Sequence, residues 1–139
     1  MKNCWLDSRI CIKTDSYFRD SNLDWIETEK QIKKQVDTNS ITITQGFIGS
    51  DSKNNTTTLG REGSDFTAAI LAYSLGADEV VIWKDVPGMM NADPKQFSEA
   101  KLFSDISFDE AIELAFFGAK VIHPKTIQPL KKKNIPLKV

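Results

Sequence analysis

The chain has 139 residues, with 18 Lys and Arg against 19 Asp and Glu, so its formal net charge is −1. This length predicts a single domain, and 40% hydrophobic with 27% charged residues excludes collagen-like, low-complexity and disordered proteins. Balanced charge gives no overall attraction to nucleic acid or to an anionic membrane, so we expect neither partner. The chain has no apolar stretch long enough to span a bilayer and no signal-peptide core, which predicts a cytoplasmic protein.

Apolar periodicity and capping residues predict an alternation of strands and helices. The expected elements are a strand over 9–13, a helix over 23–36, a strand over 41–44, a helix over 65–75, a strand over 80–83, a helix over 108–117, a helix over 124–133 and a strand over 135–139. The helix over 65–75 is apolar nearly all round, which predicts burial on most sides. The continuous apolar run 80–83 is typical of a strand covered on both faces. Such alternation predicts an α/β fold with a mainly parallel sheet.

Two cysteines, Cys4 and Cys11, are separated by six residues in an apolar stretch. That spacing suits neither a zinc pair nor a redox pair, and the sequence indicates no other metal site. We expect two reduced thiols in the core.

A first candidate site is the loop over 56–65 that precedes the apolar helix. Its glycines allow close approach of the backbone, the helix directs free N–H groups to the same point, and Arg61 adds a forked cation. This combination suits a phosphate or a carboxylate. The alternative is a plain connecting loop in which Ser64 or Asp65 caps the helix and Arg61 is solvated. The residue types alone leave both interpretations open.

A second candidate site follows the strand over 80–83. In open α/β sheets, ligands bind beyond the carboxyl ends of the strands, and Lys84 and Asp85 stand at such an end. The alternative is a loop of ordinary turns, with Met89 and Met90 filling the core.

A third candidate site lies over 117–126. Lys120 is a lone cation between apolar neighbours, where an anionic ligand would offset the cost of burial. The alternative is a lysine that reaches solvent at a helix end. His123, before a proline, is predicted to pack or to cap a helix rather than to act as a base.

Four blocks, taken in this order and spacing, closely resemble the aspartokinase family. They are GFIG at 46–49, TTLGREGSD at 57–65, WKDVPG at 83–88 with Ala-Asp-Pro at 92–94, and FGAKVIHP at 117–124. The resemblance covers nearly the whole chain, so the four blocks together are stronger evidence for the family than any one block alone.

The resemblance implies the amino acid kinase fold, a three-layer α/β/α sandwich with a mainly parallel sheet. It implies an aspartate kinase that transfers the γ-phosphoryl group of ATP, with Mg²⁺, to the side-chain carboxylate of L-aspartate, the first step of lysine, threonine and methionine biosynthesis. Family members open with a Lys-Phe-Gly-Gly-Thr-Ser segment that does not occur here. Residues 1–139 therefore resemble the C-terminal part of the catalytic domain, without its N-terminal lobe and without the regulatory domains.

By the same resemblance, Asp65 organises the catalytic lysines, and Lys120 contacts the ATP phosphates. Arg61 holds the substrate carboxylate, and Ser64 lines the same pocket. The other nucleotide-side residues implied are Gly46, Gly49, Lys84, Asp85, Met90 and Lys95.

Four positions depart from the common family pattern. Glu62 stands where glycine is usual, Lys84 where threonine is frequent, Met90 where tyrosine is frequent, and Lys95 where arginine is usual. The first of these departures adds a carboxylate beside Arg61.

A sheet without the strands of the N-terminal lobe exposes apolar surface, so we expect a homo-oligomer formed through that surface. Without the lysine of the opening segment, we expect no turnover by the isolated chain. Two alternatives are another amino acid kinase, acting on glutamate or acetylglutamate, and a non-catalytic nucleotide-binding module.

Overall fold

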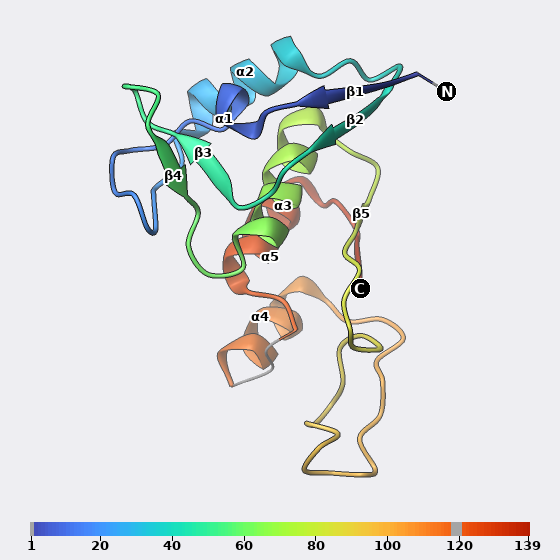
Figure 1. Ribbon diagram of the computed structural model, residues 1–139. Coiled ribbons are helices and arrows are strands. Elements are labelled where there is room, and N and C mark those ends of the chain that lie inside the picture. Colours follow the sequence, from blue (N-terminus) through green and yellow to red (C-terminus); the bar gives the residue numbers. More distant parts are fainter. Residues whose placement is uncertain (1, 118–120) are drawn as a thin grey trace.

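The computed structural model describes residues 2–117 and 121–139, in which strands and helices alternate (Figure 1). The strands are β1 (Asn3–Leu6), β2 (Ile41–Thr44), β3 (Ile48–Ser50), β4 (Thr56–Thr58), β5 (Val80–Val81) and β6 (Leu137–Lys138). The helices are α1 (Ser8–Cys11), α2 (Trp25–Gln35), α3 (Gly63–Leu75), α4 (Phe108–Phe116) and α5 (Pro124–Lys133). None of these helices is both long and apolar enough to cross a membrane.

The strands pair in three two-stranded pieces. β1 pairs with β2 and β5 with β6 in parallel, while β3 and β4 form an antiparallel pair. The register of the first pair sets Trp5 opposite Ile43 and Leu6 opposite Thr44. Parallel pairing therefore predominates, as the alternation of elements predicts.

Helix α3 separates two hydrophobic cores. Phe66 and Ile70 pack with Leu6 of β1 and Ile32 of α2, and Ala69 and Ala72 belong to a second cluster with residues of α4, α5 and β5. A helix that contributes to a core on both sides must be apolar around most of its circumference. The sequence of α3 is apolar in this way, and the prediction of its burial is confirmed.

One face of the strands is bare. Trp5 and Ile43 are 65% and 51% exposed, and Trp83, just after β5, is 93% exposed. The next side chain of β1, Leu6, is buried against Ile32 of α2 and Phe66 of α3, so these helices cover the other face of the β1–β2 pair. The expectation that residues 80–83 are covered on both faces is therefore wrong, because only Val80 and Ile82 of that run are buried.

The expected strand over 9–13 is also wrong, because α1 occupies most of that range. Asp7 caps the helix by accepting a hydrogen bond from the Arg9 amide at 3.0 Å. Ser8 and Cys11, three residues apart, point inward, while Ile10 is half exposed. Local capping therefore overrides the β-branched composition of the run.

The two cysteines differ in their surroundings. Both are free thiols, as expected, but Cys4 on β1 is exposed and only Cys11 lies in the core. Burial raises the pKa of the Cys11 thiol, which keeps it protonated and unreactive.

Candidate active site

The N-terminus of α3 has no side-chain cap. Glu62 occupies the N-cap position in a left-handed conformation, φ 53°, and its side chain makes no capping hydrogen bond. Ser64 and Asp65 lie inside the first turn, so neither caps the helix, and that part of the alternative is wrong. The other part, a solvated Arg61, agrees with the exposure of that residue. An uncapped helix start presents N–H groups and a positive dipole end to an anion.

A partly buried charge cluster lies at the same place. The Lys84 ammonium is 2.8 Å from Asp65 Oδ2 and 4.0 Å from Glu62 Oε2, and the three side chains are only 17–21% exposed. Neither oxygen accepts a directed hydrogen bond from a described residue, so Lys84 stabilises the two carboxylates mainly through its charge. Lys84 follows β5, which brings the first and second candidate sites together. Removing the lysine would leave two carboxylates close together with no counter-ion.

Gly46 allows a third segment to approach this cluster. A Cβ at Gly46 would lie 3.0 Å from Ser64 Cα, and the next amide, of Phe47, donates to Thr67 Oγ1 at 2.9 Å. Gly49 lies elsewhere: a Cβ there would be 2.7 Å from the Ile12 carbonyl oxygen. Its lack of a side chain thus serves the packing of β3 beside α1.

Arg61 and Ser64 are both exposed beside the cluster. No hydrogen bond or ion pair joins the Arg61 guanidinium to another side chain in the described parts of the chain. Among residues 2–117 and 121–139 its five donors have no partner, and their forked geometry suits a carboxylate or phosphate ligand.

The remaining nucleotide-side candidates lie on the long loop between β5 and α4, which projects from the body in Figure 1. Asp85 and Lys95 are exposed, and Met90 is half-buried in a bridge to Leu102. The Lys95 amide donates to Asp93 Oδ1 at 2.9 Å, which is an ordinary turn. No ion pair within residues 2–117 joins Asp85 or Lys95 to the Lys84–Asp65 pair.

Lys120 lies outside the described residues, as do Gly118 and Ala119 of the same block. His123 caps α5, its Nδ1 accepting from the Lys125 amide at 3.1 Å. The prediction that His123 is a capping residue is confirmed.

The sequence analysis overlooked Lys125 and Asp20. Lys125 Nζ donates to the carbonyl oxygen of Leu59 at 3.0 Å and lies 3.2 Å from Asp20 Oδ1. A lysine in the first turn of a helix is disfavoured by the helix dipole. This unfavourable position in the sequence could have indicated that Lys125 has a specific partner in another part of the fold.

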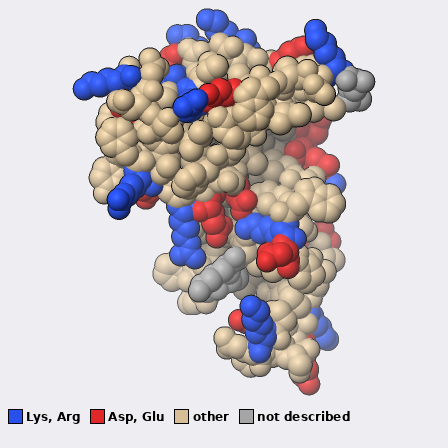
Figure 2. All heavy atoms as spheres, viewed as in Figure 1, with Lys and Arg blue, Asp and Glu red and all other residues tan. Residues whose placement is uncertain are grey.

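Charges of both signs meet at the waist of the molecule, below an extended uncharged surface that covers β1 and β2 (Figure 2). This distribution agrees with a net charge near zero and with anion recognition by local geometry.

The amino acid kinase family model matches residues 4–139, and the chain belongs to this family. The lysine-sensitive aspartokinase 3 of Escherichia coli (strain K12) is 45% identical over 136 residues, 96% of this chain and 30% of that protein. The chain thus spans about 30% of the length of this curated relative.

Crystal structures of E. coli aspartokinase III are similar in fold. The complex with aspartate and ADP (R-state) has a TM-score of 0.92 at 44% identity, covering 98% of this chain and 31% of that one. The complex with lysine and aspartate (T-state) has a TM-score of 0.85 at the same identity and coverage. The family and the fold class predicted from the four sequence blocks are confirmed.

Proposed function

We propose that this chain carries the nucleotide side and part of the aspartate pocket of an aspartate kinase. The observation that carries the proposal is the uncapped start of α3, with an exposed Arg61 just before it and the Lys84–Asp65 pair at its first turn. Similarity to an aspartokinase solved with aspartate and ADP supports the choice of substrates.

Phosphoryl transfer requires positioning and neutralisation of negative charge more than covalent chemistry. Arg61 would bind a carboxylate of L-aspartate through its forked donors, and Ser64 would line that pocket. Asp65 would fix the position of Lys84, and Lys84 and Lys120 would neutralise nucleotide phosphates. Gly46 would let the backbone approach the same point. Gly49, Asp85, Met90 and Lys95 remain proposed nucleotide-side residues.

ATP fits this arrangement because a helix start and a lysine are common phosphate ligands. Within the described residues, no three acidic, histidine or cysteine side chains form a metal-binding group. Mg²⁺ commonly enters kinase sites on the phosphates with one or two carboxylates, so this donor set is compatible with it. When bound, the metal would supply charge neutralisation.

Binding and turnover by the 139-residue chain test the proposal separately. We expect ADP to raise the melting temperature, because a ligand that binds only the folded state stabilises it. Lys120→Ala should remove that increase, and Lys53→Ala, an exposed lysine on the 51–55 loop, should preserve it. No melting shift with ADP would contradict the proposal.

Arg61→Gln should weaken L-aspartate binding by about 10- to 100-fold, the effect of losing a charge-assisted hydrogen bond.

We expect no turnover by the isolated chain, because the lysine-containing opening segment of aspartokinases does not occur in it. A coupled ATP-consumption assay with L-aspartate measures this directly. Aspartate-dependent ATP consumption would show that the chain is active and overturn this expectation. Nucleotide binding with no affinity for aspartate would favour the non-catalytic nucleotide-binding module, and a preference for glutamate or acetylglutamate would favour another amino acid kinase.

A further inference from the structure

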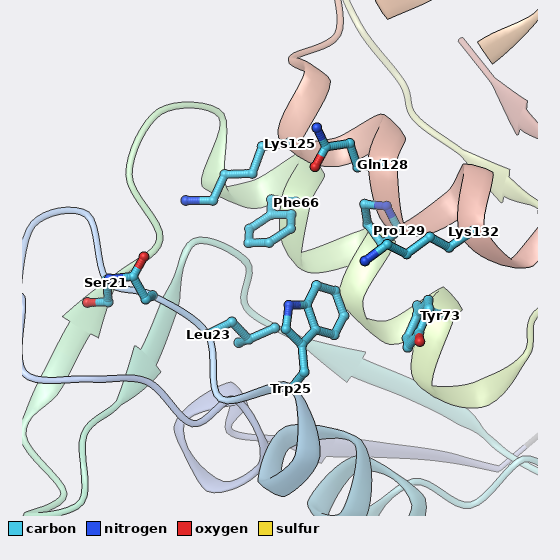
Figure 3. Close-up of a pocket in the computed structure, with 10 residues that line it drawn as sticks. Ser21, Leu23, Trp25, Phe66, Tyr73, Lys125, Gln128, Pro129 and Lys132 are labelled. Atoms are coloured by element: carbon cyan, nitrogen blue, oxygen red, sulfur yellow. The ribbon is translucent and has the colours of Figure 1, made fainter. Parts of the chain in front are cut away.

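Lys125 connects three parts of the fold that are far apart in sequence. It is the second residue of α5, its ammonium reaches the Leu59 carbonyl oxygen at 3.0 Å, and it lies 4.9 Å from the centroid of the Phe66 ring on α3. Figure 3 shows the lysine stem beside Phe66, at the rim of a cavity of about 490 Å³ between α2, α3 and α5.

The carbonyl that Lys125 holds belongs to the loop that carries Arg61. Leu59 is fully buried, and its amide is already bonded to the Phe47 carbonyl oxygen at 2.9 Å. Its carbonyl shares a peptide plane with the Gly60 amide, so fixing that oxygen fixes the chain direction immediately before Arg61. Gly60 itself has φ +74°, a left-handed conformation that is only one of several open to glycine. Contacts from neighbouring segments are therefore needed to hold the loop in this shape.

Asp20 holds the same loop from a third side. Its Oδ1 lies 3.2 Å from Lys125 Nζ, and it fills the space where a Cβ of Gly60 would stand, 2.1 Å from that position. Asp20 is 65% exposed, so its ion pair contributes little to global stability. The hydrogen bond to the Leu59 carbonyl is the contact of Lys125 that acts directly on the backbone of the loop.

We propose that Lys125 is a positioning residue that fixes the Arg61 loop relative to the start of α5. It does not touch a substrate; it acts through the peptide between Leu59 and Gly60. Since α5 begins directly after the block that contains Lys120, this lysine links the loop proposed to bind aspartate to the segment proposed to bind phosphate. The link to substrate rests on the proposed function, whereas the effect on the loop does not.

Hydrogen exchange in the 139-residue chain tests the effect on the loop. In Lys125→Met, which keeps the apolar stem on Phe66, we expect the two hydrogen-bonded amides of the loop, those of Leu59 and Gly63, to exchange about tenfold faster or more, because their local opening loses a charge-assisted hydrogen bond. The urea midpoint should stay close to that of the parent. Lys125→Arg should restore slow exchange. Lys131→Met, a lysine paired with Asp109 on the far part of α5, is the control of equal charge and should change nothing in the loop.

Asp20→Asn separates the two contacts of Lys125. It removes the ion pair and leaves the carbonyl hydrogen bond, so its effect on the Leu59 and Gly63 amides should be clearly smaller than that of Lys125→Met. Unchanged loop exchange in Lys125→Met would overturn the proposal. Faster exchange spread evenly over the chain, with a lower urea midpoint, would also overturn it, because that pattern indicates general destabilisation.

Titration with L-aspartate and with ADP tests the link to substrate. Lys125→Met should bind L-aspartate about tenfold more weakly and lose clearly less affinity for ADP, since Arg61 follows the fixed peptide directly whereas the proposed phosphate ligands Lys84 and Lys120 lie on other segments. If Arg61→Gln weakens aspartate binding and Lys125→Met does not, the link is wrong. If the parent chain binds no aspartate, the proposed function fails, and the exchange experiment still decides whether Lys125 positions the loop.

Discussion

The carboxylate of Asp7 has partners on two sides at the start of α1. It accepts hydrogen bonds from the Arg9 side chain and amide at 3.0 Å and from Gln45 Nε2 at 2.7 Å. The hydrogen bonds from Arg9, and secondarily from Gln45, hold the pKa of Asp7 well below its ordinary value of 3.8. Gln45 also accepts from the Ser8 amide, so this carboxylate ties α1 to the segment that leads to Gly46.

A lowered pKa in the folded state predicts a stability contribution that is present above pH 3.8 and lost as the pH falls through the folded pKa. Asp7→Asn keeps the capping acceptor and removes the charge. We expect it to lower the free energy of unfolding by about 1 kcal/mol at pH 7, a value reduced for solvent screening, with the difference shrinking toward zero below about pH 3. Urea unfolding across this pH range measures it. A difference that stays constant with pH would contradict the ion-pair explanation.

At the scale of elements, the turn between β4 and α3 uses left-handed conformations at Gly60 and at Glu62. Helix α3 starts without a side-chain cap because Glu62 adopts that geometry. The helix ends at Gly76, φ +65°, a residue with open space around its Cβ position. The two glycines therefore share a backbone conformation and differ in their surroundings.

That difference allows a matched comparison. Gly76→Ala should destabilise the chain by about 1 kcal/mol, the cost of placing a Cβ in a left-handed residue. Gly60→Ala should cost about 1–2 kcal/mol, because its Cβ also displaces Asp20 from Lys125. Urea midpoints of the two variants give the difference between their costs in stability. That difference should vanish when both substitutions are made in an Asp20→Ala background. Equal costs in the parent background would show that the Asp20 contact does not matter.

At the scale of the whole molecule, two cores share α3, and one side of the strands has no cover. The exposed apolar side chains of the β1–β2 pair are Trp5, Ile41 and Ile43, and Val81 and Trp83 are exposed at β5. Parallel strands are normally buried on both faces, so a bare face is a site for association. This is the surface through which we propose that the chain forms a homo-oligomer.

Sedimentation velocity over a hundredfold range of concentration tests that surface. The parent chain should associate as concentration rises, and a Trp5→Ser, Ile43→Thr double variant should remain mostly monomeric because it removes the central apolar contacts. Ile26→Thr changes an 85% exposed apolar residue on α2 and should associate like the parent. A parent chain that stays monomeric throughout would contradict the proposal.

Local signals predicted the helices well. The apolar run of α3, the Ser107 capping box of α4 and Pro124 at the start of α5 all act within a few residues of the helix ends they define. The sequence analysis was wrong at α1, where one capping aspartate outweighs β propensity, and it overlooked the β3–β4 hairpin, which joins segments on either side of a polar loop.

The sequence by itself determined the family, because four motif blocks keep their order and spacing whatever the packing around them. It also determined most helix bounds, because capping is local. Only the tertiary structure decided that Lys84 pairs with Asp65, that Gly49 serves packing, and that Lys125 holds the Arg61 loop. These contacts join residues 19 to 66 positions apart, and no periodicity in the sequence encodes a distance of that kind.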